Sequence, residues 1–308
     1  MSYKSDTTRA NRTSEAIEFP AVFLIDNCNC CNLKCSVCDH KNMTNYRPFQ
    51  IMDFELYKKI INEIAIENPN AKVWEIFFGE PFLCLDMADR IRYAKRKGLT
   101  DVVLNTNGVL MNKEKARAVI EAGLDAIYVG IDSINEKSYN QIRIGGDYNR
   151  VCKNVLDYKD LLDKIGKPNQ KIFVQFVVSD INEKEIDDFK NFWEKHGIGI
   201  KIRPKISWAG LVDAPNLWEN KDVSRKPCYW LMRTINICAD GEVSLCSVDL
   251  HCQVKCGNIK NNSIKELWDG KLKEYRNMHK NGRYNELPKL CRDCRDWQSA
   301  YAEFYGSY

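Results

Sequence analysis

The sequence predicts an α/β protein: a parallel β-sheet curved as a partial barrel, followed by a small cysteine-rich module. Two observations support this fold class. Strand-like and helix-like segments alternate six times between residues 20 and 205, which is typical of parallel β-α units. From residue 228 on the alternation of strand-like and helix-like segments ends, and cysteines surround a hairpin signal. A chain of 308 residues is long enough for one large core and an appended module.

Six strands and five helices follow from the residue pattern. We expect strands at 21–25, 72–77, 101–104, 125–130, 171–178 and 198–203. The first helix is indicated by the helical spacing of Phe54, Tyr57, Ile61 and Ile64. We expect the other helices at 87–97, 113–122, 151–165 and 183–196. Six units are fewer than a closed eight-stranded barrel has, and functional residues should follow the carboxyl ends of the strands.

Composition excludes several classes of partner. The net charge of +4 is spread without a dense basic block, which gives no case for nucleic acid. No apolar run approaches the length of a membrane span, and the polar residues 1–18 lack a signal-peptide core. We therefore expect a cytoplasmic protein. Fourteen cysteines in so long a cytoplasmic chain indicate metal binding or catalysis rather than disulfides.

The most informative stretch is Cys31-Asn-Leu-Lys-Cys35-Ser-Val-Cys38, in a loop after the first expected strand. Soft thiolates select iron–sulfur clusters or zinc. Structural zinc takes four protein ligands, and the loop offers no obvious fourth beyond His40, two residues past Cys38. Three thiolates leave one iron of a [4Fe–4S] cluster open. The cluster is thus favoured over zinc, and over three buried free cysteines.

This spacing, at this place in the chain, resembles that of the radical S-adenosylmethionine (radical SAM) enzymes. The resemblance implies a partial (β/α)6 barrel, like a TIM barrel with fewer strands. It implies that SAM binds the open iron, and that the reduced cluster cleaves SAM to a 5′-deoxyadenosyl radical that takes hydrogen from a substrate carbon. It also implies an external electron donor such as flavodoxin or ferredoxin.

Further motifs follow the later strands. Phe78-Gly79-Glu80-Pro81 comes after the second strand and is similar to the family's G-G-E-P motif, with Phe78 replacing the first glycine. The resemblance implies that Gly79, Glu80 and Pro81 contact SAM, with Glu80 near its amino group. An ordinary turn containing glycine and proline is the alternative for this stretch taken alone.

The third and fourth strands end in motifs of the same kind. Asn105-Thr106-Asn107-Gly108 and Gly130-Ile131-Asp132-Ser133 stand there. By resemblance, Asn107 lies near the SAM sugar, Ser133 or its neighbours contact SAM, and Arg143 reaches the SAM carboxylate. An exposed helix arginine is the plain alternative for Arg143. The four motifs occur in the family's order.

The C-terminal module contains Cys228, Cys246, Cys291 and Cys294, a hairpin signal at 239–242, and a capping box at Ser263 and Glu266. This pattern resembles the SPASM/twitch modules of radical SAM enzymes. It implies a second [4Fe–4S] cluster, which four thiolates would saturate and suit to electron transfer. A zinc ribbon on the same four cysteines is the alternative.

These features divide the chain into four parts. Residues 1–19 form a polar lead-in, 20–210 the radical SAM barrel, 211–227 a linker and 228–308 the SPASM/twitch module.

Seven cysteines remain outside the two ligand sets. Cys84 and Cys152 are expected in the core, and Cys28 and Cys30 crowd the first loop. Cys238, Cys252 and Cys256 lie in the module, where one of them is a candidate replacement ligand, a ligand of a further cluster or a hydrogen donor to a substrate radical. A single auxiliary cluster is the favoured interpretation.

The favoured function is oxidation of a sugar-like or aminocyclitol alcohol, with the auxiliary cluster accepting an electron. Many related modules have a Cys-Cys pair where this chain has Cys246-Ser247, and serine is a poor hydrogen-atom donor. Arg203, at the end of the sixth strand, is a candidate to hold or deprotonate the substrate hydroxyl. A plain surface arginine is the alternative.

Three other functions stay open. One is a radical epimerase of a sugar or peptide with Cys252 or Cys238 as donor. Another is a peptide-modifying enzyme, of the kind that matures sulfatases or crosslinks ribosomal peptides, against which the short segment before the barrel counts mildly. The third is an iron–sulfur or zinc protein without catalysis.

Overall fold

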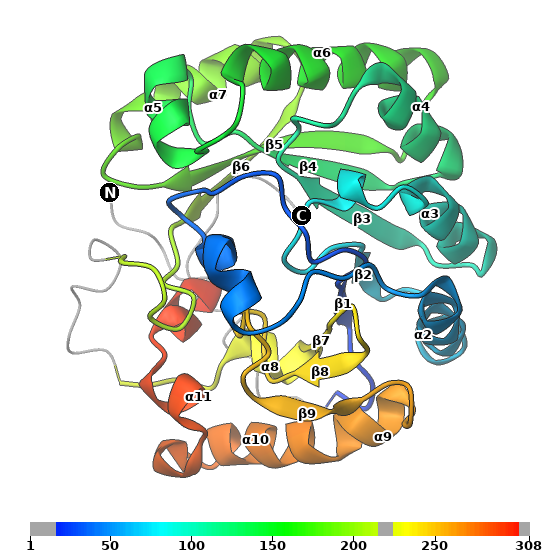
Figure 1. Ribbon diagram of the computed structural model, residues 1–308, viewed down its shortest axis with the longest axis vertical. Coiled ribbons are helices and arrows are strands. Elements are labelled where there is room, and N and C mark those ends of the chain that lie inside the picture. Colours follow the sequence, from blue (N-terminus) through cyan, green and yellow to red (C-terminus); the bar gives the residue numbers. More distant parts are fainter. Residues whose placement is uncertain (1–16, 215–223, 302–308) are drawn as a thin grey trace.

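The computed structural model describes residues 17–214 and 224–301 (Figure 1). Most of the expected lead-in, residues 215–223 of the expected linker and residues 302–308 of the module lie outside the described residues.

One nine-stranded sheet organises the chain, in the order β6-β5-β4-β3-β2-β1-β7-β8-β9. Strands β1 to β7 are parallel where they pair, and β8 and β9 are antiparallel. The bounds are β1 Val22–Ile25, β2 Lys72–Trp74, β3 Asp101–Thr106, β4 Ala126–Gly130, β5 Lys171–Val178, β6 Gly199–Pro204, β7 Thr234–Ile237, β8 Glu242–Ser244 and β9 Lys255–Asn258. The predicted fold class, six parallel β-α units and a C-terminal module, is confirmed.

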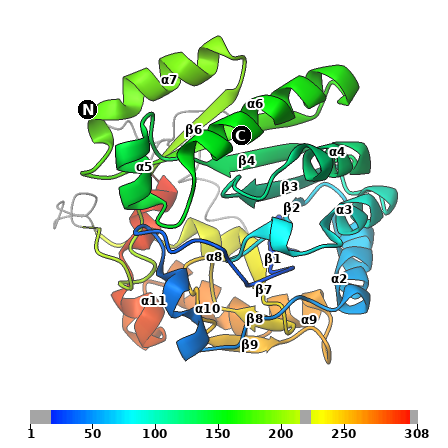
Figure 2. The same ribbon diagram turned by 45° about the horizontal axis from the view of Figure 1, so that its top comes forward.

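Helices α2 to α7 cover one face of β1 to β6 (Figure 2). They are α2 Phe54–Glu67, α3 Met87–Arg96, α4 Lys113–Ala122, α5 Glu136–Ile142, α6 Tyr148–Ile165 and α7 Ile186–Lys195. Helix α5 and the 3-10 helices η1 (Asp39–Asn45) and η2 (Pro81–Leu83) were not expected. In the part of the chain that the structure describes, no helix has the length and apolar character needed to cross a membrane.

Strand β2 ends at Trp74 instead of residue 77, although the backbone N–H of Glu75 still donates to the Val103 carbonyl at 2.9 Å. The carboxylate of Glu75 points to the helix-covered face, toward α2. This carboxylate is fully buried and accepts hydrogen bonds from the hydroxyl of Tyr57 (2.5 Å) and the amide of Asn27 (2.6 Å). A buried carboxylate needs such partners. The chain after β2 is an irregular loop that leads to Gly79.

The two faces of the sheet carry different side chains. Alternate residues such as Val102, Ile127 and Val174 pack under the helices in the main core. Because side chains alternate along a strand, the intervening residues line the opposite face, which we term the inner face. An aromatic cluster lies there, in which Tyr128 stacks on Phe173 with ring centroids 4.8 Å apart.

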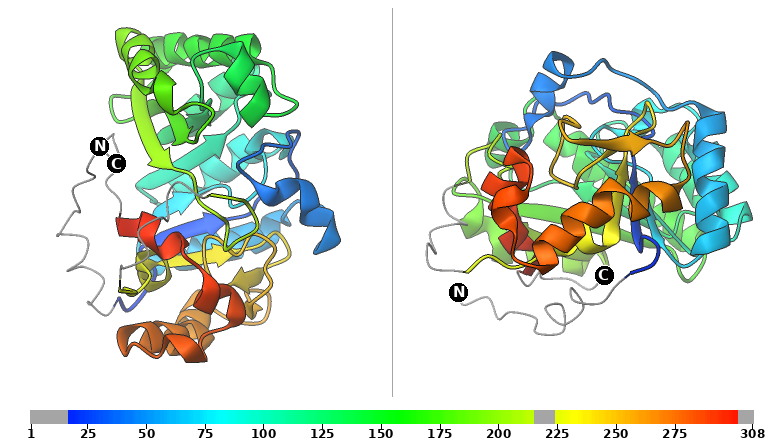
Figure 3. Two further views of the ribbon diagram at one scale, coloured as in Figure 1. Left: turned by 90° about the vertical axis from the view of Figure 1, so that its left-hand side faces the viewer. Right: turned by 90° about the horizontal axis from the view of Figure 1, so that it is seen from below.

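The module extends this sheet. Its β7 pairs with β1 in parallel, and its helices are α8 Tyr229–Arg233, α9 Ile264–Asp269, α10 Lys271–Lys280 and α11 Lys289–Asp293. Figure 3 shows it, yellow to red, at the β1 end of the sheet. The predicted hairpin joins β7 to β8, with Gly241 at φ 87°, and both hydrogen bonds of the predicted capping box at Ser263 and Glu266 are present.

Substitution of Trp193 tests how helix α7 packs against the sheet. It is fully buried in α7, so Trp193→Ala should cost roughly 3–5 kcal/mol of the free energy of unfolding. The adjacent Phe192 is 37% exposed, and Phe192→Ala should cost about 1 kcal/mol. Urea unfolding of the two variants checks this. Equal losses would show that α7 does not pack as described.

Candidate active site

The three cysteines of the C-x3-C-x2-C sequence lie in one loop after β1. Backbone hydrogen bonds of 2.9 Å from Lys34 and Ser36 fix this loop to the carboxyl end of α5. The backbone of Cys38 donates to the Cys35 carbonyl at 3.2 Å, and Cys38 is the N-cap of η1. The loop places Cys31 and its two partners at the carboxyl edge of the sheet, where functional residues of such folds lie.

Polar N–H groups surround these sulfurs. The amide Nδ2 of Asn107 lies 3.9 Å from Cys31 Sγ, and Nη1 of Arg143 lies 3.8 Å from Cys35 Sγ. Burial raises the pKa of Cys31 to about 11 and that of Cys38 to about 12. Metal binding must therefore displace thiol protons. Soft sulfur ligands with N–H donors around them fit an iron–sulfur cluster.

The loop after β2 packs against the cysteine loop at Gly79. A Cβ atom there would lie 1.8 Å from the Cys28 carbonyl oxygen and 2.7 Å from that of Cys30. The next residue, Glu80, donates its backbone N–H to the Cys30 carbonyl at 2.6 Å. Only glycine permits this approach, so Gly79 allows the loop after β2 to pack tightly against the cysteine loop.

The side chain of Glu80 organises the turn after β3. Its carboxylate accepts hydrogen bonds from the hydroxyl of Thr106 (2.7 Å) and the backbone N–H groups of Asn107 (2.8 Å) and Phe82 (3.2 Å). Burial raises its pKa. Pro81, the next residue, opens η2. The contact of Glu80 with the SAM amino group stays a prediction.

The two polar side chains of the motif after β4 point in different directions. The hydroxyl of Ser133 lies 2.7 Å from Glu185 Oε2, directed toward the start of α7. Asp132, one of the neighbours of Ser133 in the predicted motif, is fully buried at φ 62° and pairs with Arg143 at 2.6 Å. Arg143 thus joins Asp132 to Cys35. The signal available in the sequence was only the position of Asp132 directly before Ser133.

The four cysteines of the module line one small cavity. Its walls are Arg225, Cys228, Trp230, Leu231, Cys246, Val248, Leu290, Cys291, Cys294 and Trp297. Burial raises the pKa of Cys246 well above its usual value, and the other three thiols add to the shift. The cysteines come from three separate segments, since Cys291 and Cys294 share one, so the fold itself assembles this set.

The arrangement bears on the choice between cluster and zinc. In the described ranges, no three or more His, Cys, Asp or Glu side chains are grouped to hold a metal ion. Four sulfurs of a zinc ribbon meet at one ion, whereas a four-iron cluster fills the space between its thiolates. A cavity lined by four cysteines therefore fits a cluster.

The two cysteine sets lie toward opposite ends of the β1–β7 pair. The Cys31 loop follows the carboxyl end of β1. Cys228 is the N-cap of α8, which leads into the amino end of β7. Cys246 follows β8, which runs antiparallel to β7. Each of β1 and β7 has four residues, or roughly 13 Å of strand. The length of this strand pair therefore separates the two sets.

The remaining predicted residues fall into two places. Cys238 and Cys252 are hydrogen-bonded to each other through their thiols and are buried in an apolar cluster with Phe77 and Phe78. Cys252 has φ 52°, an uncommon backbone for a residue other than glycine. Arg203 is half-buried on β6, on the inner face.

Sequence reasoning missed a set of polar residues on the inner face. The amide Nε2 of Gln175 donates to Asn105 Oδ1 at 2.6 Å, and the hydroxyl of Ser247 lies 3.0 Å from Asn236 Oδ1. Lys201 is buried, with its ammonium 4.9 Å from the centroid of the Tyr128 ring. Polar side chains at alternate positions of otherwise apolar strands were the signal in the sequence.

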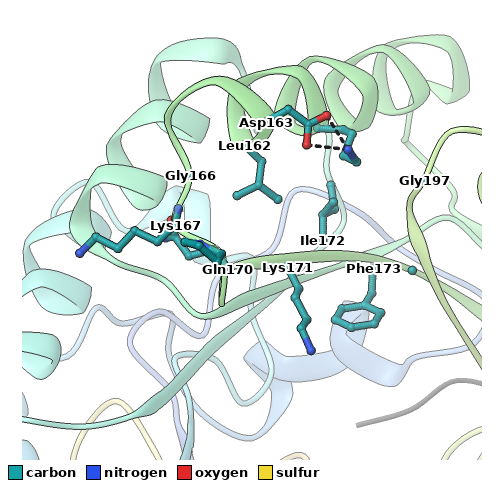
Figure 4. A pocket seen from close by; sticks show the side chains of 12 residues that line it. Leu162, Asp163, Gly166, Lys167, Gln170, Lys171, Ile172, Phe173 and Gly197 are labelled. Atoms are coloured by element: carbon teal, nitrogen blue, oxygen red, sulfur yellow. Dashed lines mark hydrogen bonds and ion pairs between the residues drawn. The ribbon is translucent and has the colours of Figure 1, made fainter.

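A further hollow of about 540 Å³ lies at the other edge of the sheet (Figure 4). Its walls include Lys171 and Gly199, which begin β5 and β6, and Gly166 at the end of α6. No predicted site residue lines it. The amino ends of parallel strands are not where such folds place their chemistry.

Curated proteins of similar sequence include GTP 3′,8-cyclases. The probable GTP 3′,8-cyclase of Methanococcus maripaludis is 30% identical over 172 residues, which are 56% of this chain and 54% of that protein. The GTP 3′,8-cyclase of Clostridium botulinum is 30% identical over 177 residues, 56% of this chain and 52% of that protein. The chain thus spans about half the length of the curated relatives it matches.

Solved structures share the fold at low sequence identity. BtrN in complex with AdoMet and 2-DOIA aligns with a TM-score of 0.62 and 15% identity, over 91% of this chain and 94% of that chain. Streptococcus suis SuiB bound to precursor peptide SuiA gives 0.70 and 13%, over 92% and 72%. Native anSMEcpe with bound AdoMet gives 0.61 and 16%, over 92% of each chain.

The family models cover both parts of the chain. Residues 28–192 match the radical SAM superfamily, and residues 228–295 match the SPASM iron–sulfur cluster-binding domain. These domains imply SAM and [4Fe–4S] clusters as cofactors. Cysteine spacing, the parallel barrel and both matches agree: this chain belongs to the radical SAM superfamily and carries a C-terminal SPASM domain.

Proposed function

We propose that this enzyme oxidises a hydroxyl group of a sugar-like or aminocyclitol substrate and that the SPASM cluster accepts an electron. The observation that carries the proposal is the placement of the two cysteine sets toward opposite ends of the β1–β7 pair. Of the polar inner-face residues, Asn236 lies on β7 itself, with the hydroxyl of Ser247 3.0 Å from its Oδ1. A substrate held there has the radical source at one end and an electron acceptor at the other.

The bound cofactors supply a 5′-deoxyadenosyl radical, which takes one hydrogen atom from the carbinol carbon, and an oxidised cluster, which takes one electron. The hydroxyl proton is released, so C–H and O–H bonds are lost and a C=O bond forms. Flavodoxin or ferredoxin is the kind of partner that would supply the electron for SAM cleavage. The protein's own part is to bind, orient and keep out water.

Two groups of residues hold the cofactors in this proposal. Cys31, Cys35 and Cys38 hold the first cluster, and Cys228, Cys246, Cys291 and Cys294 the second. The SAM-binding residues are Gly79, Glu80, Pro81, Asn107, Ser133 and Arg143. Support comes from the contacts of Asn107 and Arg143 with sulfur and from the packing of Gly79 against the cysteine loop. For Ser133 the contact with Glu185 favours an indirect role, through the loop that carries Asp132.

Buried amides on the inner face support a hydroxylated substrate. Nδ2 of Asn236 and Oε1 of Gln175 are buried without a hydrogen-bond partner among the described residues. Such atoms are costly unless something pairs with them. A ligand with several hydroxyl or amino groups would supply both an acceptor and a donor. Arg203 projects from the same face, and its N–H groups can hold a hydroxyl oxygen but not take its proton, because a guanidinium has no acceptor atom.

Ser247 favours oxidation over epimerisation. It directly follows the proposed ligand Cys246, and its hydroxyl lies 3.0 Å from Asn236 Oδ1 on the inner face. An O–H bond is much stronger than an S–H bond, so serine does not readily return a hydrogen atom to a carbon radical. The substrate radical would then lose its electron to the second cluster.

The contact between Cys238 and Cys252 favours a second candidate, radical epimerisation. The two thiols are buried together beside Phe77 and Phe78, in the segment that leads to Gly79. A thiol there would return a hydrogen atom to the substrate carbon. Similar proteins also include SuiB, which was solved bound to a peptide, and cyclases named for a nucleotide. The unpaired amides of the inner face favour a hydroxylated ligand over these two substrate classes.

The first prediction concerns Gly79. Gly79→Ala should separate the loop from Cys28 and Cys30, since the added Cβ meets backbone atoms that have no freedom to rotate away. Reconstituted protein should lose most SAM cleavage and part of its iron. Gly98→Ala is the control: its Cβ meets nothing within 4 Å, and it carries only the strain of φ 94°. Full SAM cleavage by Gly79→Ala would reject the role of this contact.

The second prediction concerns cluster number. The protein should bind about eight irons. Replacing Cys31, Cys35 and Cys38 by alanine should halve that number and abolish 5′-deoxyadenosine formation. Replacing Cys291 and Cys294 should also halve it but leave some SAM cleavage uncoupled from product. Cys152→Ala, in α6, serves as the control and should change neither quantity. Formation of 5′-deoxyadenosine by the first variant would contradict the ligand assignment.

The third prediction separates oxidation from epimerisation. Cyclitols and sugars are screened for 5′-deoxyadenosine formation, and the active compound is turned over in deuterated water. We expect a product two mass units lighter than the substrate, with Cys238→Ala and Cys252→Ala still producing it. An isomer carrying one solvent deuterium at carbon, and losing it in either cysteine variant, would instead establish epimerisation.

A further inference from the structure

His279 lies between two of the proposed cluster ligands. It stands on α10 and is fully buried. Its Nδ1 is 3.3 Å from the backbone nitrogen of Cys228, and its Nε2 is 3.2 Å from Sγ of Cys291. One imidazole ring thus touches cysteines from two separate segments of the SPASM domain.

The backbone contact fixes which ring nitrogen carries the proton. The nitrogen of Cys228 can only donate a hydrogen bond, so Nδ1 of His279 must accept it. In the neutral ring the proton is then on Nε2, which points at the Cys291 sulfur. The arrangement is therefore an N–H···S hydrogen bond to a proposed ligand.

Arg225 approaches the same sulfur from another side. Its Nη2 lies 3.9 Å from Cys291 Sγ and 2.6 Å from the Cys291 carbonyl oxygen. The guanidinium is held over the ring of Tyr284, at 4.8 Å from the centroid. Cys291 thus has a hydrogen-bond donor and a positive charge beside its sulfur.

Hydrogen bonds and positive charge at cluster sulfurs stabilise the reduced, more negative state and so raise the reduction potential. At the first cysteine set the amide of Asn107 and the guanidinium of Arg143 approach Cys31 and Cys35 only to 3.9 and 3.8 Å. The 3.2 Å contact of His279 is shorter. The hydrogen bond from His279 therefore favours a higher reduction potential at the SPASM cysteines, as an electron acceptor requires, than at the first cysteine set, whose cluster must be a strong reductant.

We propose that His279 is a positioning residue that acts through Cys291 to raise the reduction potential of the SPASM cluster, with Arg225 adding to the effect. The inference rests on the ligands given under the proposed function. It gives a reason, within this chain, why that cluster accepts an electron from the substrate radical.

The test is an EPR-monitored redox titration of the reconstituted full-length protein without substrate. The SPASM signal is the one that the Cys291 and Cys294 double variant lacks. His279→Phe should lower the midpoint potential of the SPASM cluster by about 59 mV. For a one-electron couple this corresponds to a tenfold change in the reduction equilibrium constant. His279→Gln keeps an N–H donor at the same reach and should restore most of the potential. His196→Phe, on the distant end of α7, is the matched control.

A second measurement covers the case in which His279→Phe fails to bind the cluster. Pulsed EPR of wild-type protein labelled with ¹⁵N-histidine should show a nitrogen coupling to the reduced SPASM cluster that is absent in His279→Gln. An unchanged midpoint in His279→Phe, equal shifts in the Phe and Gln variants, or no nitrogen coupling would each overturn the inference. Failure of the proposed ligand set is seen separately, as retention of both signals in the double cysteine variant, and failure of the proposed oxidation leaves these potentials unaffected.

Discussion

The parallel pairing of β7 with β1 is the interaction on which the rest of the structure depends. Hydrogen bonds outside the two strands extend the ladder at both ends, from Ala21 to the Arg233 carbonyl (3.0 Å) and from Asp26 to that of Ile237 (2.8 Å). Through this pairing the SPASM domain continues the barrel sheet and buries its own apolar face in the same core. The separation of the two cysteine sets is therefore set by strand length, which a rigid sheet holds constant.

Contacts between the cysteine loop and the turn after Cys246 add to this constraint. The ring of His251 is buried, with Nε2 2.9 Å from Asp39 Oδ2, and it stacks on Tyr46 at 3.8 Å between centroids. Nearby, Arg47 pairs with Asp26 at 3.1 Å. Breaking one partner of a buried pair is costly, because the other is left uncompensated. Such pairs fix one arrangement of the loop relative to the SPASM domain.

Much of this was accessible from the sequence, for identifiable reasons. Cysteine spacing and strand-end motifs are local, so the Cys31 loop and the hairpin at Gly241 could be anticipated. For Gly79 the sequence predicted a contact with SAM, and the structure instead shows its packing against Cys28 and Cys30. Contacts between distant segments could not. Nothing near Asn236 signals that Ser247 pairs with it, nothing near His279 signals Cys291, and Ser133 faces Glu185 because α7 packs there. Buried polar side chains such as Glu75 and Gln175 form hydrogen bonds with residues far along the chain, and the periodicity of the sequence does not reveal these partners.

The most direct test of the account is whether the SPASM cluster becomes reduced during turnover. Protein whose clusters are oxidised is supplied with SAM, an active cyclitol and a flavodoxin-type electron donor, freeze-quenched at intervals and examined by EPR. A parallel sample without cyclitol shows how much SPASM cluster the donor reduces directly, and this amount is subtracted. We expect the signal of the reduced SPASM cluster to grow in step with 5′-deoxyadenosine and oxidised product. Product formed at the same rate while that cluster stays oxidised would contradict the central claim.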